Sequence, residues 1–213
     1  MGQDLDELFD VVDERDRVTG QAARRVVHAN GWRHRAVHVL VFDRGGRVFL
    51  HQRSMTKDLF PGAWDSSCAG HVGAGEDYDT SAVRELEEEL GIGADVATLS
   101  RGSSAAMELS RGVVPPLRDR PQMQRLFKLE AQPDTGWEFV WVYRLEHEGP
   151  FTLHPDEIER GDWFTPEEVD RWLKLRAGEI APALALLWPM VSGQVREDGG
   201  QKGRAERPAP PRT

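Results

Sequence analysis

Apolar and polar positions along the chain form short blocks that predict a protein rich in strands. Runs of β-branched and aromatic residues, separated by Gly, Pro and charged turns, are typical of strands that pack on a core. The predicted turns lie at residues 14–17 and 43–46. The pattern predicts strands over residues 8–13, 36–42, 48–53, 64–69, 137–145 and 157–164, and a further short run that ends at Val27.

Two helices are predicted near the C-terminus. Pro166 opens one over residues 167–176, where proline suits the first turn, and an apolar helix is expected over residues 183–191. Strands alternating with helices indicate an α/β fold, in which a mixed sheet carries helices on its faces.

At 213 residues the chain suits one domain, which we place at residues 1–192. Residues 101–122 contain Gly, Ser and Pro without any period, so a mobile surface insertion is expected there, or alternatively a lid over a site. Residues 193–213 have almost no apolar side chains, and a disordered tail is expected.

Composition restricts the class of ligand. A net charge of −9 argues against a nucleic-acid or anionic membrane surface, but not against a phosphorylated ligand, because a bound cation can invert the local field. Cys68 is the single cysteine, which excludes an internal disulfide framework. The start of the chain has no basic or apolar run, and no later segment approaches the roughly 18 apolar residues of a membrane span. We expect a cytoplasmic protein without nucleic-acid or membrane partners; the sequence predicts no oligomeric state.

An amphipathic helix with an acidic face is predicted after a glycine-rich loop. Asp77 or Asp79 can cap its start, and Gly91 suits a left-handed C-terminal position. One apolar stripe recurs at helical spacing and can face a core. The stripe consists of Ala82, Val83, Leu86 and Leu90.

Three glutamates share another face of this predicted helix. Glu85, Glu88 and Glu89 stand at i, i+3 and i+4, and like charges at such spacing cost about 0.2–0.5 kcal/mol per pair. Either solvent and Arg84 offset this repulsion, or a hard divalent cation does, since Mg²⁺ takes oxygen ligands. The preceding loop allows the backbone to approach a ligand closely. Its glycines are Gly70, Gly73 and Gly75.

This stretch resembles the Nudix box, G-x5-E-x7-R-E-U-x-E-E-x-G-U, where U is aliphatic. The resemblance implies a Nudix-type α/β/α sandwich and a metal-dependent hydrolase. Its substrate would be a small molecule with a diphosphate linkage, a nucleoside diphosphate derivative or a similar organic diphosphate. Every specified position is filled, by Gly70, Glu76, Arg84, Glu85, Leu86, Glu88, Glu89, Gly91 and Ile92.

The resemblance also implies residue roles. The three glutamates and the Gly70 carbonyl would ligate Mg²⁺ or Mn²⁺, and Glu85 would also act as the general base. Glu76 and Arg84 would hold the glutamates in place. A further carboxylate on a later strand is expected at Glu138, or else at Glu157 or Glu159. Arg53 and Lys57 are candidate phosphate contacts, with exposed cations as the alternative reading.

A second resemblance is to type I isopentenyl-diphosphate isomerases, which share the Nudix fold. There, three histidines and two glutamates hold a metal beside a catalytic cysteine. Gly136 stands at one glutamate position and Ala69 at the cysteine position, while Cys68 would point to the opposite face of its strand. The matching positions are His28, His34, His71 and Glu138; the three histidines are a candidate second metal site, with surface or packing histidines as the alternative reading.

The replacement of one glutamate by Gly136 and of the cysteine by Ala69, together with a complete box, favours a hydrolase in the isomerase-like branch of the Nudix hydrolases. An isomerase of prenyl diphosphates remains one alternative, and a non-catalytic nucleotide-sensing Nudix module is another. The full set of box carboxylates argues against a mere binding module.

Overall fold

The computed structural model describes residues 5–57, 59–97 and 120–205, with side chains as far as residue 193. Its N-terminal half contains β1 (Leu8–Val12), β2 (Val18–Ala23), α1 (Arg24–Asn30), β3 (His34–Phe42), β4 (Val48–Arg53), β5 (Trp64–Asp65), β6 (Cys68–His71), α2 (Tyr78–Leu90) and β7 (Asp95–Val96). The C-terminal half contains β8 (Gln122–Leu129), the 3-10 turn η1 (Pro133–Thr135), β9 (Glu138–Glu146), β10 (Ile158–Phe164), α3 (Pro166–Leu175), the 3-10 turn η2 (Ala177–Glu179) and α4 (Pro182–Ala205).

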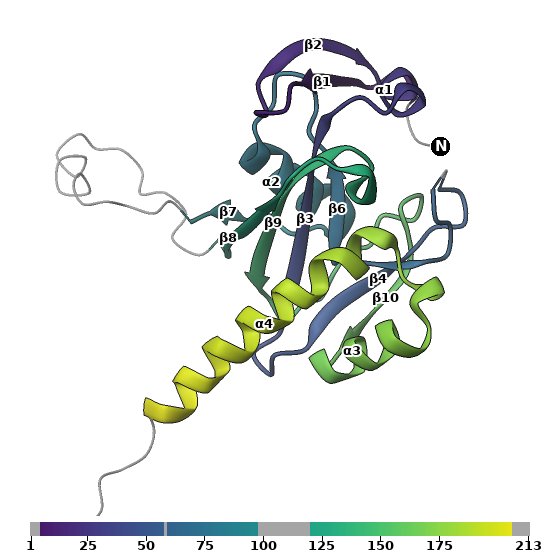
Figure 1. Ribbon diagram of the computed structural model, residues 1–213. Helices are drawn as coiled ribbons and strands as arrows, with labels where there is room; N and C mark the ends of the chain where they lie inside the picture. Colours follow the sequence, from purple (N-terminus) through teal and green to yellow (C-terminus); the bar gives the residue numbers. More distant parts are fainter. Residues whose placement is uncertain (1–4, 58, 98–119, 206–213) are drawn as a thin grey trace, which may run out of the picture.

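The main sheet is mixed and carries helices on both faces (Figure 1). Its strand order is β10-β4-β3-β9-β8-β7; β3 and β9 run parallel, whereas β3–β4, β4–β10 and β8–β9 are antiparallel. The hairpin β1–β2 forms a separate two-stranded sheet at one end of the molecule (Figure 1). The α/β/α sandwich predicted from the sequence is therefore confirmed.

Two hydrophobic cores lie on opposite faces of the sheet, and alternation along β3 divides its side chains between them. Val37, Val39 and Val41 pack in the core that includes Leu86 and Leu90 of α2. The second core joins the other face of β3 to α3 and α4. From β3 it takes Ala36, Leu40 and Phe42, and from the helices Val169, Leu184, Leu187 and Trp188.

The sheet splits along β3, and this split creates the space for a site. The C-terminal end of β3 pairs with β4, at Val41 with Phe49 and at Phe42 with Val48. The rest of β3 pairs with β6 from Ala36 to Val39, while β4 pairs with β5. The segment β5–β6 therefore fills the wedge between diverging strands.

Most predicted elements are confirmed, and four expectations need correction. The predicted run that ends at Val27 is the strand β2 followed by helix α1, which Gly31 ends in a left-handed conformation with φ of 59°. The predicted strand over residues 64–69 is two short strands, because the chain turns from one pairing partner to another at Ser66 and Ser67.

The other two corrections concern the C-terminal half. Gln122 begins β8, a strand that the pattern did not predict; residues 98–119, which hold most of the expected insertion, lie outside the described residues. Helix α4 continues to Ala205, into the segment expected to be disordered from residue 193, because extending a formed helix costs little. Within the described part, no helix is long and apolar enough to cross a membrane.

Candidate functional site

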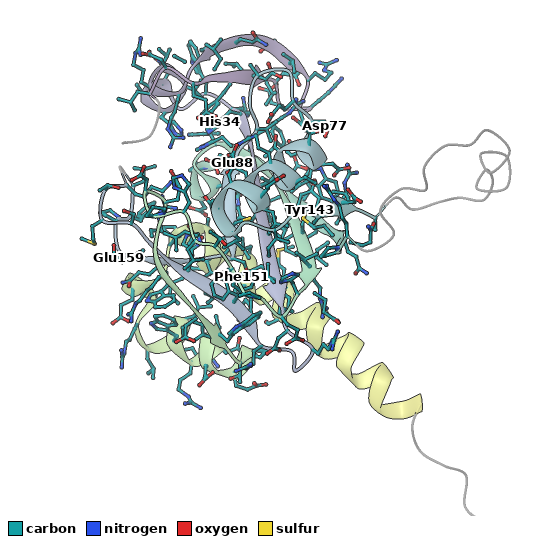
Figure 2. The ribbon with its side chains drawn as sticks, turned by 180° about the vertical axis from the view of Figure 1, so that it is seen from behind. His34, Asp77, Glu88, Tyr143, Phe151 and Glu159 are labelled. Atoms are coloured by element: carbon teal, nitrogen blue, oxygen red, sulfur yellow. The ribbon has the colours of Figure 1, made fainter. Side chains whose placement is uncertain are left out.

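A cavity of about 1220 Å³ lies where the sheet splits. It is bounded by β3, β4 and β6, by the acidic side of α2, and by η1 and the start of α4. Figure 2 shows Glu88 on α2 and His34 at the start of β3, below the β1–β2 hairpin. All three box glutamates line this cavity, together with Gly70, Arg53 and Lys57.

Helix α2 is fixed at both ends, which sets the direction of its glutamates. The Asp77 carboxylate accepts the Thr80 N–H at 2.8 Å, so Asp77 is the N-cap. Gly91 ends the helix with φ of 69°. Because Leu86 and Leu90 face the core, Glu85 and Glu89 lie on the adjacent, inward flank, whereas Glu88 is 56% exposed.

The backbone of β6 supports the two inward glutamates. A Cβ atom at Gly70 would lie 2.0 Å from the Glu85 carboxyl carbon, so the box requires glycine here for space. One oxygen of Glu89 accepts the Ala69 N–H at 3.3 Å. Both carboxylates therefore lie against the strand, at the edge of the cavity.

Arg84 links the glutamates to the glycine-rich loop. Its Nη1 donates to Glu85 at 2.8 Å and to Glu88 at 3.1 Å. Its Nη2 donates to Glu76 and to the carbonyl of His71, each at 3.1 Å. Glu76 in turn accepts the Ser81 hydroxyl at 2.6 Å. Arg84 therefore joins Glu85 and Glu88 to Glu76, and the holding role that the resemblance implies for Arg84 and Glu76 stays a prediction.

Burial and charge crowding act on the inward glutamates. Burial raises the pKa of Glu85 against the opposing effect of Arg84, and burial together with the Glu85 charge raises the pKa of Glu89. Carboxylate oxygens are ligands that hard divalent cations take, and the three box glutamates line one cavity with Gly70. These residues therefore fit the expected Mg²⁺ or Mn²⁺.

The glutamates do not form the tightest set of would-be ligand atoms. Among the described residues, the group with three ligand atoms within 4.8 Å of one another is His28, His34 and His71. Arg84 Nη1 joins the carboxylates of Glu85 and Glu88, and the Glu89 carboxylate lies apart from them on the Ala69 N–H.

The histidines come from three elements and converge through strand register. His34 pairs with Glu138 across the parallel β3–β9 ladder, and His71 pairs with Ala36. One Glu138 oxygen lies 3.1 Å from His71 Nε2 and 3.3 Å from His34 Nε2. The Phe9 ring stacks on both His34 and His71.

The hydrogen bonds of His34 constrain its protonation. Its Nδ1 lies 2.9 Å from the Trp32 carbonyl, which can only accept, so Nδ1 carries a proton. A neutral His34 then turns the Nε2 lone pair toward the Glu138 carboxylate. A proton or a cation between these two atoms removes the repulsion, so the histidines and Glu138 also fit a metal.

The candidate phosphate contacts are held by acids at the cavity wall. Arg53 Nη1 donates to Asp65 at 3.0 Å. Lys57 pairs with Glu157, and burial lowers the pKa of Lys57 to about 8. Arg24, which the sequence reasoning missed, also lines the cavity, with Nη1 at 3.1 Å from His71 Nδ1. Its assignment to a strand run concealed its position at the start of α1.

The remaining candidate residues differ in whether they line the cavity. Glu157 lines the cavity, whereas Glu159 is exposed and does not. Cys68 is fully buried in the core on the α2 face, and burial raises the pKa of its thiol. Ala69 lines the cavity in its place. The described arrangement therefore presents no thiol to the site.

Comparisons with known proteins agree with this geometry. The family described as NUDIX domain matches residues 32–187. An uncharacterized Nudix hydrolase of Streptomyces coelicolor is 56% identical over 86 residues, 40% of this chain and 48% of that protein, so the match spans about half of that relative. The uncharacterized Nudix hydrolase YfcD of Escherichia coli K12 is 34% identical over 184 residues, 84% of this chain and 86% of the relative.

An enzyme with another name and a solved structure are also similar. Isopentenyl-diphosphate Delta-isomerase of Nocardia farcinica is 30% identical over 195 residues, 90% of this chain and 98% of the relative. The crystal structure of DR0079 from Deinococcus radiodurans is 27% identical with a TM-score of 0.65, covering 86% of this chain and 98% of that one.

Proposed function

The chain belongs to the Nudix family, and we propose that it is a divalent-metal-dependent hydrolase that cleaves the diphosphate linkage of a nucleoside diphosphate derivative or a similar organic diphosphate. Membership makes it a Nudix hydrolase, which acts on phosphoanhydride bonds. The metal, the substrate and the residue roles below are part of the proposal.

One observation carries the proposal. The carboxylates of Glu85 and Glu89 are buried against the Ala69–Gly70 backbone, and they line the same cavity as Arg53 and Lys57. Acids that can hold a cation thus adjoin cations that can hold an anion. A metal-bound diphosphate requires both at once, because its charge is larger than either partner can neutralise alone.

Each group has a stated part in the reaction. Glu85, Glu88, Glu89 and the Gly70 carbonyl would hold Mg²⁺ or Mn²⁺, which when bound supplies Lewis acidity and an activated water. Glu85 accepts the proton of the attacking water, since its carboxylate lies at the cavity edge. Arg84 and Glu76 keep the glutamates aligned, and Arg53 and Lys57 bind phosphate oxygens.

The cavity leaves room for an organic group beyond the diphosphate. At about 1220 Å³ it exceeds the roughly 300–1,000 Å³ of common ligand pockets. Around the start of α4 the cavity is lined by apolar side chains, most of them small. They include Ala181, Pro182, Ala183, Ala185 and Leu186.

A second candidate is isomerisation of a prenyl diphosphate. The histidine cluster with Glu138 favours it, and it fits a second cation site. Against it stand the missing carboxylate at Gly136 and the burial of Cys68 in the core. Gly136 has φ of 67° and ends η1, so its backbone suits glycine rather than glutamate.

Glutamine variants of the box test the hydrolase. Glu89→Gln and Glu88→Gln are assayed for Mg²⁺- and Mn²⁺-dependent phosphate release across nucleoside diphosphates, nucleotide sugars, dinucleoside polyphosphates and prenyl diphosphates. Both variants should lose turnover by orders of magnitude, because each removes an anionic metal ligand. Glu87→Gln, on the exposed side of the same helix, is the matched control and should keep wild-type turnover.

Two results would remove the hydrolase. Wild-type turnover in both variants would eliminate the proposed metal site. Absence of hydrolysis by the wild type on the whole panel, with tight nucleotide binding, would favour the sensing module. The same panel tests the isomerase with Cys68→Ala, which should leave hydrolysis unchanged because the thiol lies in the core.

A further inference from the structure

A cluster of buried polar side chains lies at the wall of the cavity, where the proposed function assigns it no role; two of its members, His38 and Asp65, line the cavity. It fills the wedge between β3 and β4, and consists of His38, His51, Asp65, Ser66 and Ser67. Buried polar groups are costly unless they are satisfied, so a cluster of this size at the edge of a site needs a reason.

Asp65 is the charged member of this cluster, and both of its oxygens are engaged. Oδ1 accepts the Ser66 N–H at 2.8 Å, and Oδ2 accepts Nη1 of Arg53 at 3.0 Å. The backbone holds the carboxylate still, since Asp65 pairs with His51 across the β4–β5 ladder and the Arg53 N–H donates to Ala63 at 2.9 Å. The acid and its arginine therefore come from paired strands.

Arg53 is fixed at two of its three nitrogens. Nε donates to the Leu59 carbonyl at 3.1 Å and Nη1 donates to Asp65, while Nη2 makes no hydrogen bond to another described residue. The side chain is only 15% exposed, and Arg53 lines the cavity together with Lys57 and Glu89. A guanidinium is rigid and planar, so fixing two nitrogens also fixes the third.

We propose that Asp65 is a positioning residue, whose buried carboxylate holds the Arg53 guanidinium so that Nη2 is directed at a phosphate oxygen of the substrate. The proposal rests on the proposed function, because it takes the cavity to be the diphosphate site. Asp65 itself does not touch the substrate.

A role in stability alone explains the buried Asp65–Arg53 ion pair less well than a positioning role does. Replacing a buried ion pair by apolar residues is often neutral or stabilising, so stability gives little reason to keep one. Burial works to raise the pKa of Asp65, yet His38 and Arg53 outweigh it and the pKa stays below its usual value, so the carboxylate is ionised. Arg53 pairs with this ionised acid and offsets its negative charge at the wall of the proposed anion site.

The test measures binding of methylenediphosphonate, a pyrophosphate analogue that is not hydrolysed, to the full chain with Mg²⁺ by isothermal titration calorimetry. Asp65→Asn should weaken binding at least tenfold, since an amide cannot accept from both Ser66 and Arg53. Arg53→Ala should weaken it by at least as much. The double variant should bind no more weakly than Arg53→Ala, because Asp65 acts only through Arg53.

Asp43→Asn is the matched control. Asp43 is as buried as Asp65, at 4% exposure for each side chain, and holds Arg47 at 2.7 Å, but it lies outside the cavity. Its loss should lower the melting temperature and leave the affinity for methylenediphosphonate unchanged. A general effect of losing a buried aspartate is thereby separated from an effect on the site.

Wild-type affinity in a folded Asp65→Asn variant overturns the proposal, and so do additive effects in the double variant. If Asp65→Asn does not fold, Arg53→Lys decides. Lysine keeps the positive charge, but its single ammonium group cannot contact Leu59 and Asp65 and also donate to a phosphate oxygen. Binding at least tenfold weaker in Arg53→Lys therefore supports the proposal, and wild-type binding overturns it. Because the readout is binding, a wild type that binds but hydrolyses nothing would refute the proposed function and not this inference.

Discussion

At the scale of single residues, one step along β6 decides what chemistry the cavity can do. Cys68 and Ala69 are neighbours on a strand, so their side chains point to opposite faces. The structure places Cys68 in the core and Ala69 at the cavity, as the alternation predicts. A position that would carry a nucleophile or acid thus carries a methyl group instead.

Gly70 gives the first residue-scale prediction. Gly70→Ala places a methyl group 2.0 Å from where the Glu85 carboxyl carbon lies, so this carboxylate must move. A displacement near 1 Å in a catalytic group can cost about 100-fold in rate. We expect turnover to fall by about that factor while the melting temperature changes little, measured by phosphate release and thermal denaturation.

Gly178→Ala is the comparison for this variant, because a Cβ atom there meets nothing within 4 Å. It should keep wild-type turnover. Full activity in Gly70→Ala would mean that the position of Glu85 against β6 has no part in catalysis.

At the scale of elements, the sequence predicted those whose own residues carry the signal. Helix α2 has an apolar stripe, an Asp77 cap and a terminal Gly91, and all three are in place. Strand β8 was missed because its residues, Gln-Met-Gln-Arg-Leu-Phe-Lys-Leu, lack strict alternation, and the strand is exposed or half-buried along most of its length. Its pairing with β9 is a tertiary effect that no local pattern records.

The residues of the candidate site also fall into those that the local sequence predicts and those that long-range strand pairing brings to the cavity. The box glutamates and Arg84 lie within one helix, so spacing alone placed them on one side. Arg24 and Asp65 could not be found, because α1 and the β5–β6 wedge bring them to the cavity through long-range pairing. The histidines were recognised by resemblance, and their convergence depends on the register of β3 against β6 and β9.

The wedge itself gives a prediction about stability. The Ser67 hydroxyl accepts the Val41 N–H at 2.7 Å and donates to the Phe49 carbonyl at 2.5 Å. It therefore takes the place of a direct backbone hydrogen bond between β3 and β4. Ser67→Ala leaves both backbone groups buried without this partner. At about 1–3 kcal/mol for each of these two groups, the free energy of unfolding should fall by about 2–6 kcal/mol in urea titrations.

Ser192→Ala is the control for this loss. Ser192 is also buried, but its hydroxyl makes a single bond of 3.3 Å to the Pro189 carbonyl within α4. Its removal should cost less than about 1 kcal/mol. Equal losses in the two variants would contradict the bridging role of Ser67.

At the scale of the whole molecule, one carboxylate holds the β1–β2 hairpin against the main domain. Asp16, in the hairpin turn, accepts Arg35 from β3 at 2.6 Å and the Tyr78 hydroxyl from α2 at 2.9 Å, and it also pairs with Lys128 from β8. This contact keeps Phe9 of β1 stacked on the histidine cluster. The hairpin therefore packs directly on the histidine cluster, although none of the β1 or β2 residues lines the cavity.

Buried histidine also makes the stability of the whole chain depend on pH. Burial lowers the pKa of His51 from 6.5 to about 4, against the smaller opposing effect of Asp65. Between these two values the unfolded chain binds a proton that the folded chain does not, so unfolding is favoured as pH falls from about 6.5 to about 4. The shift in pKa corresponds to a decrease of up to about 3 kcal/mol in the free energy of unfolding, complete near pH 4.

Glu85 and Glu89 change stability in the opposite direction, because their raised pKa values let the folded chain bind protons at a higher pH than the unfolded chain does. The contribution of His51 is therefore measured as the difference between the wild type and His51→Asn. The Asn amide can still donate to the Ser67 carbonyl, which His51 Nδ1 contacts at 3.1 Å. Between pH 6.5 and 4 the free energy of unfolding should fall less in His51→Asn than in the wild type. Parallel urea titrations of the two proteins across this range measure the difference, and identical slopes would show that His51 takes up its proton as readily in the folded chain as in the unfolded one.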